Sequence, residues 1–317
     1  MSVSLFDLHC DTAYALLNNG EGKTLDLRSN NLHISLNRAR CLHDYVQCFA
    51  CFTSFEDPLC QKYGCEAVLE MELSAINKQI EICSDLIQFA GNAAAIENNC
   101  KCGKMSAILS LEGSAGFNYD PTRLEELYQK GFRITTLGWN DGNCLTGSHK
   151  TGAGLSEQGR EYVKVAQELG MIVDVSHISD RAFWDIIDIS SAPIIASHSN
   201  SRKVHPVSRN LTDEMFLAIC QLDGVAGINL YSAFLGENAT LDTVCDHIFH
   251  YLELDPDGKH IAMGADLDGC NSLPAGFSGV QSFEHLADRL IDRGLSNKTL
   301  TNLLWNNAME VFAKCCT

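Results

Sequence analysis

Eight short apolar runs alternate with longer stretches of helical periodicity along the chain, and this alternation constrains the fold more than any other feature. The apolar runs predict strands over 3–9, 44–52, 105–111, 132–137, 171–176, 193–197, 225–230 and 260–265. The periodic stretches predict helices over 66–90, 121–130, 156–169, 179–189, 212–222, 240–252, 281–293 and 296–313. Strands that alternate with helices in this way form parallel sheets, because each helix carries the chain back to where the next strand begins.

The number of units predicts the architecture. Eight strand–helix units without a composition break or a Pro/Gly linker indicate one α/β domain over residues 1–317, a (β/α)8 TIM barrel. Hydrophobic residues make up 45% of the chain, enough for a large core. An open doubly wound sheet is the alternative, and it is disfavoured because no G-x-G-x-x-G pattern follows the first predicted strand.

Side chains that can bind metal stand at the carboxyl ends of the predicted strands. The H-x-D pair His9 and Asp11 ends the first strand, where side chains two residues apart share a face. Four further strands are followed by Glu112, His177, His198 and Asp266. Each alone would be read as a hydrogen-bonded core residue. Because active sites of such barrels lie at this rim, the set predicts a hydrolytic metal site that suits zinc.

Charge and terminal sequences limit the partners. The net charge of −17 argues against a nucleic-acid partner, since a phosphate backbone would be repelled. Residues 1–7 lack the basic and apolar regions of a signal peptide, and residues 313–317 form neither a prenylation box nor a GPI-type tail. No window reaches the ~18 apolar residues of a membrane span. We therefore expect a cytoplasmic protein without a membrane partner or the cell-surface role of anchored enzymes.

The chain contains 15 cysteines, an odd number that indicates reduced thiols rather than a disulfide framework. A thiolate metal site at Cys60 and Cys65, or at Cys100 and Cys102, would need a second pair at zinc-finger spacing, which the sequence lacks. A thiolate enzyme is disfavoured because no cysteine has a neighbouring histidine in a basic environment. The terminal pair 315–316 is expected to be exposed.

The sequence resembles the membrane (renal) dipeptidase family of zinc metallopeptidases, in a small unanchored form like that of bacteria. The resemblance runs in order from residue 5 to about residue 312. Its motifs are Asp7–Thr12 (DLHCDT), Leu109–Gly113 (LSLEG), Asp174–His177 (DVSH), Ala196–Asn200 (ASHSN), Ser208–Glu214 (SRNLTDE) and Gly264–Gly269 (GADLDG). The motifs are specific as a set, and the resemblance implies the same barrel with two zinc ions per chain.

The resemblance also implies the ligand sets. His9, Asp11 and Glu112 would hold one zinc ion, and Glu112, His177 and His198 the other. Glu112 would bridge the two ions, which a carboxylate can do because it has two oxygens. The reaction implied is hydrolysis of dipeptides by a hydroxide that bridges the ions.

Two further residues acquire roles through the resemblance. Asp266 would accept the proton of the attacking water and pass it to the leaving amine, with Asp268 as a secondary candidate. Arg209 would bind the free carboxylate of the dipeptide, because a guanidinium can do so with two hydrogen bonds. The substrates implied are L,L-dipeptides and also L,D-dipeptides, and family members often form homodimers.

One position departs from the family pattern. Mammalian members have a histidine after the fourth strand that polarises the scissile carbonyl, and here Trp139 stands at the aligned position. Tryptophan can donate one hydrogen bond but cannot carry a positive charge. Either Trp139 and Asn140 form a bacterial variant of this loop, or His149 reaches in, or catalysis is weakened. All three are therefore predicted substrate-binding residues.

Other functions remain open at this point. A metal-dependent amidohydrolase acting on an N-acyl amino acid, another small amide or a lactone would keep the metals but would not need Arg209. A scaffold that kept the ligands for stability would not need Asp266. The acidic side chains of Glu66, Glu70 and Glu72 are expected to form a solvated helix face.

Overall fold

The computed structural model describes residues 2–17 and 25–317, and nine strands of these residues form one parallel sheet. The strands are β1 (Leu5–Cys10), β2 (Tyr45–Phe52), β3 (Ile87–Phe89), β4 (Met105–Glu112), β5 (Phe132–Thr136), β6 (Ile172–Asp174), β7 (Ile194–Ala196), β8 (Val225–Ile228) and β9 (Ile261–Met263). All except β3 lie within one residue of a predicted strand or inside it. Their residues are almost all buried, as in parallel sheets covered on both faces.

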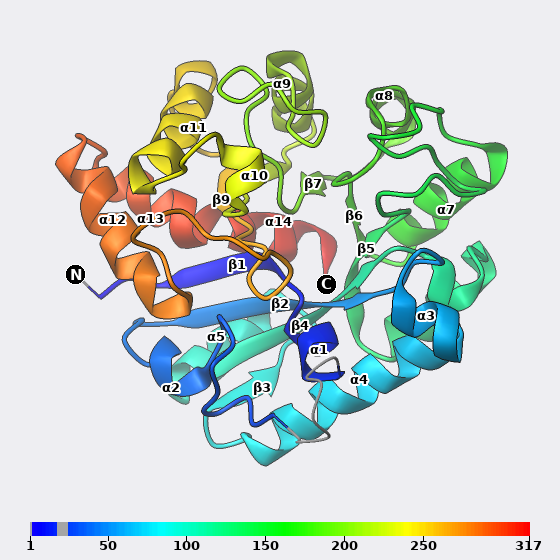
Figure 1. Ribbon diagram of the computed structural model, residues 1–317, viewed down its shortest axis with the longest axis horizontal. Coiled ribbons are helices and arrows are strands. Elements are labelled where there is room, and N and C mark those ends of the chain that lie inside the picture. The colour runs from blue at the N-terminus through cyan, green and yellow to red at the C-terminus, as the bar shows by residue number, and fades with distance from the viewer. Residues whose placement is uncertain (1, 18–24) are drawn as a thin grey trace.

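Eight of these strands close into a barrel. They are hydrogen-bonded in the order β2-β1-β9-β8-β7-β6-β5-β4, and β2 pairs in turn with β4. That closing ladder runs from Val46 opposite Ser106 to Phe52 opposite Glu112. Helices surround the strands (Figure 1), which confirms the (β/α)8 TIM barrel.

The prediction of one helix over 66–90 is wrong at its carboxyl end. Helix α4 (Cys65–Ile82) ends eight residues earlier, and β3 follows it. Ile87–Phe89 pairs with Met105–Ala107, on the edge of β4 that β5 occupies from Leu109 onward. A three-residue strand has too few residues to show a period of two, so the apolar pattern of the helix masked it.

The helices follow the strands in the predicted order. They are α1 (Thr12–Leu17), α2 (Leu36–Ala39), α3 (Pro58–Tyr63), α4, α5 (Ala93–Lys101), α6 (Leu124–Gln129), α7 (Glu157–Glu168), α8 (Asp180–Ile189), α9 (Asp213–Gln221), α10 (Ser232–Leu235), α11 (Leu241–Leu254), α12 (Phe283–Asp292), α13 (Asn297–Thr301) and α14 (Asn307–Cys315). The predicted helix 296–313 is interrupted by a π-turn at Asn302–Asn306. Helices α1, α2, α3 and α10, each of at most six residues, were not predicted, and neither was the nine-residue α5.

A core cluster of alternate strand residues packs against the last helix. Ile108, Ser110 and Glu112 are every second residue of β4, so their side chains share one face of the strand. The cluster that contains Ile108 therefore lies on the face that carries Glu112. Phe312 of α14 belongs to it, and its ring lies 6.0 Å from that of Phe6. Residues 315–316, expected to be exposed, are buried against the same cluster. All 15 cysteines are free thiols.

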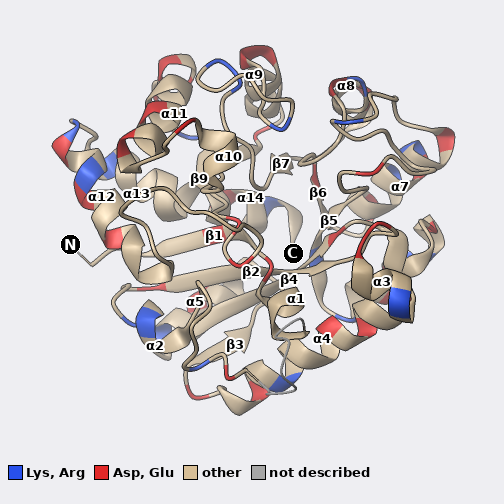
Figure 2. Ribbon diagram, viewed as in Figure 1, with Lys and Arg blue, Asp and Glu red and all other residues tan. Residues whose placement is uncertain are grey.

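Charged residues of both signs are spread over the outer helices (Figure 2). On α11 and α12, for example, Arg289 pairs with Asp242 and Arg293 with Asp246, at 2.7 and 2.8 Å. No helix in the described part of the chain is long and apolar enough to cross a membrane.

Candidate active site

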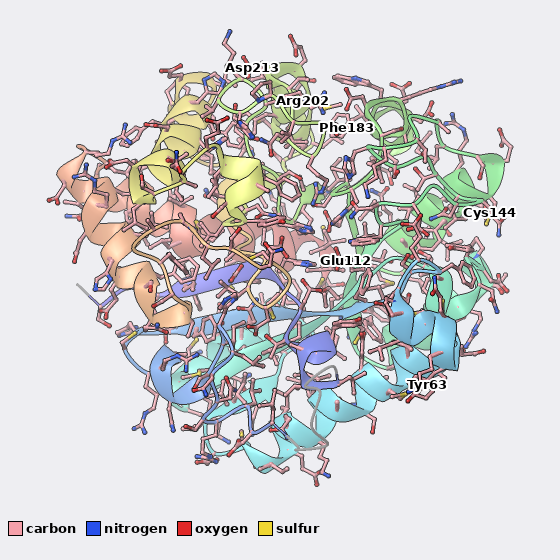
Figure 3. The ribbon with its side chains drawn as sticks, viewed as in Figure 1. Tyr63, Glu112, Cys144, Phe183, Arg202 and Asp213 are labelled. Carbon is pink, nitrogen blue, oxygen red and sulfur yellow. The ribbon has the colours of Figure 1, made fainter. Side chains whose placement is uncertain are left out.

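The carboxyl ends of the barrel strands bring the six predicted rim residues together. Glu112 is the last residue of β4 and lies near the centre of the molecule (Figure 3). The ends of β1, β6, β7 and β9 supply His9, Asp11, His177, His198 and Asp266. All six are between 1% and 8% exposed, so their charges and lone pairs face one another rather than bulk water.

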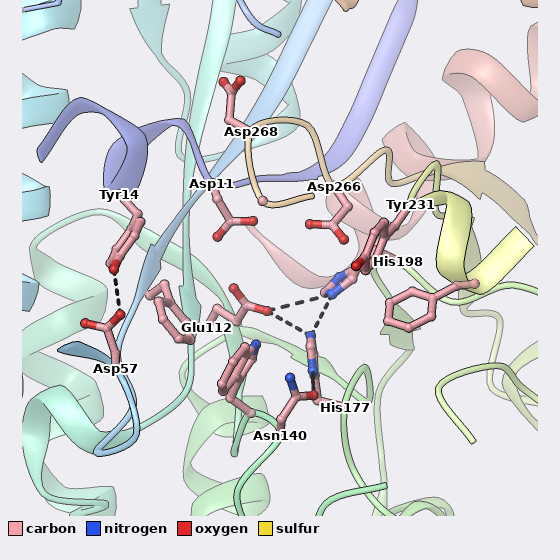
Figure 4. Close-up of a pocket in the computed structure, with 14 residues that line it drawn as sticks. Asp11, Tyr14, Asp57, Glu112, Asn140, His177, His198, Tyr231, Asp266 and Asp268 are labelled. Carbon is pink, nitrogen blue, oxygen red and sulfur yellow. Dashed lines mark hydrogen bonds and ion pairs between the residues drawn. The ribbon is translucent and has the colours of Figure 1, made fainter. Parts of the chain in front are cut away.

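Glu112 lies at the centre of this cluster (Figure 4). Its Oε1 is 2.9 Å from Nε2 of His177 and 3.8 Å from Nε2 of His198. Its Oε2 is 3.6 Å from Nε2 of His9, and that nitrogen is 3.3 Å from Oδ2 of Asp11. The two carboxylate oxygens of Glu112 therefore face two different groups of ligand atoms.

Hydrogen bonds fix which nitrogen of His177 and His198 carries the proton. Nδ1 of His177 lies 2.9 Å from Oδ1 of Asn140, which can only accept. Nδ1 of His198 lies 2.6 Å from Oγ of Ser197, whose hydroxyl proton is already donated to Asp174 at 2.6 Å. Burial lowers the pKa of both imidazoles well below the usual value, so they are neutral. Both therefore donate through Nδ1 and carry a lone pair on Nε2.

These lone pairs converge on one point. The Nε2 atoms of His177 and His198 are 2.8 Å apart, and the former also faces the Glu112 carboxylate. Lone pairs that face one another at this distance repel each other unless a cation lies between them. Two imidazole nitrogens and a carboxylate oxygen are ligands that zinc and similar dications accept, so these residues fit a metal ion.

The second group of ligand atoms differs in part from the predicted set. Ligand atoms within 4.8 Å of one another come from His9, Asp11 and Asp266, and also from His9, Glu112 and His198. Asp266 thus belongs to the same group of ligand atoms as His9 and Asp11. Gly269 makes room for this group, because a Cβ there would lie 1.9 Å from Oδ2 of Asp11 and 2.4 Å from Oδ1 of Asp266.

The buried charges shift one another's ionisation. Burial, together with the nearby Asp11 carboxylate, raises the pKa of Asp266 to about 8. Burial opposes ionisation of Glu112 too, but the adjacent His9 outweighs it and the pKa of Glu112 is lowered. Burial likewise disfavours the charged form of His9, yet Glu112 and Asp11 raise its pKa well above the usual value. Glu112 is therefore ionised at neutral pH and can serve as an anionic ligand for a cation.

Backbone strain occurs at the same place. His177, Asp266 and Asp268 have φ of 71°, 58° and 67°, in the left-handed region that residues with a Cβ rarely adopt. The loop at 147–149 holds His177, because the backbone N–H of His149 donates to the His177 carbonyl at 2.8 Å. The side chain of Asp268 turns toward Thr12, whose hydroxyl donates to it at 2.7 Å.

A cavity of about 230 Å³ opens over the cluster. It is lined by Asp11, Tyr14, Phe52, Asp57, Glu112, Trp139, Asn140, His177, His198, Tyr231, Phe234, Asp266, Asp268 and Gly269. Of the four predicted substrate-binding residues, Trp139 and Asn140 line it. Its volume lies below the ~300–1,000 Å³ of pockets for drug-sized molecules, which favours a small ligand.

Arg209 lies behind one wall of the cavity. Its Nη1 donates to Oγ of Ser199 at 3.2 Å and its Nη2 to the His198 carbonyl at 3.3 Å. The guanidinium lies 5.4 Å from the ring of Phe234, and its Nε has no partner among the described residues. Arg209 is 4% exposed and retains unused N–H donors, so it can bind an anion by donating hydrogen bonds to it.

His149 does not line the cavity. Its Nε2 lies 2.9 Å from Oδ1 of Asn140, and its Nδ1 lies 2.8 Å from Oγ of Ser208. A hydrogen-bond chain thus runs from Ser208, next to Arg209, through His149 and Asn140 to the ring of His177.

Among the site residues that were not predicted, Tyr14 and Asp57 line the cavity and Asn229 contacts Asp266. Tyr14 donates to Asp57 at 2.6 Å, and Asp57 also caps the start of α3 through two backbone N–H groups. Asn229 donates to Oδ2 of Asp266 at 3.1 Å. Asp57 precedes Pro58 as helix caps often do, and Asn229 directly follows an apolar run, so both signals were present in the sequence.

The prediction that Glu66, Glu70 and Glu72 form a solvated face of α4 is wrong for Glu72. Glu66 and Glu70 are exposed and pair with Arg123 and Lys130, at 2.8 and 2.6 Å. Glu72 is fully buried, and neither of its carboxylate oxygens has a hydrogen-bond partner among the residues that the structure describes. Burial raises the pKa of Glu72 well above its usual value, so this side chain is a neutral acid.

Comparison with known proteins identifies relatives in sequence and in fold. An uncharacterised dipeptidase of Schizosaccharomyces pombe is 34% identical over 215 residues, 66% of this chain and 53% of that protein. The chain therefore spans about half the length of that relative. A crystal structure of a family M19 dipeptidase has a TM-score of 0.87 at 24% identity, covering 100% of this chain and 99% of the other.

A second solved structure has the same fold. It is a metallopeptidase from Rhodobacter sphaeroides liganded with a phosphinate mimic of the dipeptide L-Ala-D-Ala, with a TM-score of 0.89 and 23% identity. The match covers 99% of this chain and 100% of that one. The sequence profile of the membrane dipeptidases, peptidase family M19, matches residues 1–316. The chain belongs to the membrane dipeptidase family, peptidase family M19.

Proposed function

We propose that this chain is a binuclear zinc dipeptidase that hydrolyses L,L- and L,D-dipeptides. The observation that carries the proposal is the convergence of unshared lone pairs from His177, His198 and Glu112 on one point. His9, Asp11 and Asp266 offer ligand atoms for a second ion beside it. Bound dications supply Lewis-acid charge, which polarises a carbonyl group and lowers the pKa of water.

Asp266 is suited to move the proton. Its Oδ2 accepts a hydrogen bond from Asn229, which leaves Oδ1 to take a proton from the attacking water. The same atom can then deliver the proton to the nitrogen of the leaving amino acid. The hydrogen bond from Asn229 holds the carboxylate in place for both transfers.

Arg209 and the small cavity account for the length of the substrate. The unused donors of Arg209 match the two oxygens of a free carboxylate, and an uncompensated buried guanidinium gains strongly from such a partner. A dipeptide bound in this way places its one peptide bond between the arginine and the cluster. The mimic of L-Ala-D-Ala in the related metallopeptidase supports acceptance of a D-residue at the carboxyl end.

Amino-acid release from a panel of L,L- and L,D-dipeptides tests the proposal. Each dipeptide is paired with its C-terminal amide and the matching tripeptide, with zinc-loaded and chelator-treated protein. We expect cleavage of the free dipeptides only, lost with chelator and in Asp266→Asn. Equal cleavage of the amides would favour an amidohydrolase of another substrate class, and unchanged activity in Asp266→Asn would exclude its role.

We also propose one catalytic domain over residues 1–317. The homodimer and the cytoplasmic location stay predictions. Size-exclusion chromatography with light scattering tests the dimer.

A further inference from the structure

The side-chain amide of Asn140 is held in one orientation by two histidines. Its Oδ1 accepts hydrogen bonds from Nδ1 of His177 and from Nε2 of His149, each at 2.9 Å. A metal ion bound at Nε2 of His177 requires the proton on Nδ1, so turning the amide over would place its NH2 group against that N–H donor. His177 in its metal-binding form therefore fixes the side that the amide nitrogen faces.

His149 is itself held in the form that this arrangement needs. Its Nδ1 lies 2.8 Å from the Ser208 hydroxyl, which can donate to it. With Nδ1 accepting from that hydroxyl, the imidazole carries its proton on Nε2, which faces Asn140.

The amide nitrogen of Asn140 is left without a partner among the described residues, although Asn140 lines the cavity. Figure 4 shows the amide oxygen turned toward His177 and the nitrogen on the other side. The two N–H groups of the Asn140 amide thus lie beside the cluster around Glu112, with no acceptor among the described residues.

We propose that Asn140 is a catalytic residue whose Nδ2–H donates to the scissile carbonyl oxygen as negative charge develops there. His149 is a positioning residue that acts through Asn140. The inference rests on the proposed dipeptidase function. It assigns to a neutral amide the task for which the family resemblance predicts a histidine, at the residue after Trp139. A preorganised donor of this kind typically contributes 10²- to 10³-fold to kcat.

The test combines Asn140→Ala, His149→Ala and the double variant with zinc content, melting temperature, kcat, KM and affinity for a phosphinate dipeptide mimic. For Asn140→Ala we expect kcat to fall about 10²- to 10³-fold and phosphinate affinity to fall with it. Asn140→Ala also loses the hydrogen bond to His177, so all variants are assayed at saturating zinc, where KM and zinc content should stay near the wild-type values. His149→Ala should have a smaller effect, which disappears in the Asn140→Ala background because both act through one amide.

Three outcomes overturn the inference: wild-type kcat in Asn140→Ala, a loss of kcat explained by lost zinc, or independent effects of the two substitutions. If the wild-type protein releases no amino acid from any dipeptide, the proposed function fails. Phosphinate binding by wild type and not by Asn140→Ala would still support the donor in that case, and equal binding would reject it.

Discussion

His177 and His198 point their Nε2 atoms at each other across 2.8 Å, and both nitrogens carry lone pairs. The protein holds this unfavourable contact through Asn140 on one side and Ser197 on the other. Partners of this kind fix the orientation of ligand histidines before a metal binds. These hydrogen bonds therefore orient the two histidines as the proposed metal site requires.

Removing the hydroxyl of Ser197 should weaken metal binding. Ser197→Ala frees Nδ1 of His198 from its partner and breaks the link to Asp174, so the imidazole can change tautomer. We expect about 10- to 100-fold weaker zinc binding, measured by competition with a chelator. The exposed Ser84→Ala should bind zinc as the wild type does. Equal affinity in both variants would contradict a role for Ser197.

Replacing Arg209 by lysine should weaken binding of substrates through their free carboxylate specifically. Lysine keeps the charge but loses the paired N–H donors. A charged hydrogen bond contributes about 1.5–3 kcal/mol, so kcat/KM for dipeptides should fall about 10- to 100-fold. Arg289→Lys on α12, far from the cavity, is the matched control. A similar loss with C-terminal amides as substrates would mean that Arg209 only stabilises the wall.

Alanine at Gly269 should disrupt the second group of ligands. Its Cβ would overlap the carboxylates of Asp11 and Asp266. We expect Gly269→Ala to bind fewer zinc ions per chain by elemental analysis and to lose most of its activity. Gly91→Ala, whose Cβ would meet only the end of the Arg133 side chain at 2.9 Å, should keep both. Full zinc content in Gly269→Ala would show that the ligands can move aside.

Neutralising Glu72 should change how stability depends on pH. The folded protein keeps Glu72 protonated, whereas the unfolded chain ionises it above about pH 4.5. The folded state then binds more protons, so this residue lowers stability as pH rises. The stability of Glu72→Gln relative to wild type should rise between pH 5 and 8, by at most about 1.4 kcal/mol per unit. The measurement is urea unfolding of metal-free protein at each pH.

Glu81→Gln, at an exposed position of the same helix, is the control for Glu72 and should show no such trend. A pH-independent difference for Glu72→Gln would mean that the buried carboxylate is ionised, with a cation or water as its partner.

Much of the barrel and its rim could be predicted because both depend on local patterns. A buried strand is a continuous apolar run, and the ends of parallel strands must meet at one rim. That rule alone placed His9, Glu112, His177 and His198 together before any distance was known. The three-residue β3 lacked such a pattern and was missed.

The rest of the site depends on loop conformation. His149 bonds to Ser208, which lies 59 residues away in the chain, and nothing in either segment indicates the other. The left-handed backbone of His177 was equally hidden, because sequence patterns place glycine in that conformation. The buried position of Glu72 was missed since a lone acid on a helix resembles its exposed neighbours.

The first and last barrel strands meet beside the cluster, and this has a consequence for biosynthesis. The Asp266 N–H donates to the His9 carbonyl at 3.2 Å, and the Asp11 N–H donates to the Leu267 carbonyl at 2.9 Å. A nascent chain that has not yet emerged past residue 269 cannot assemble the group of His9, Asp11 and Asp266. Chains truncated before Asp266 would lack one member of that group and are therefore expected to be inactive as hydrolases.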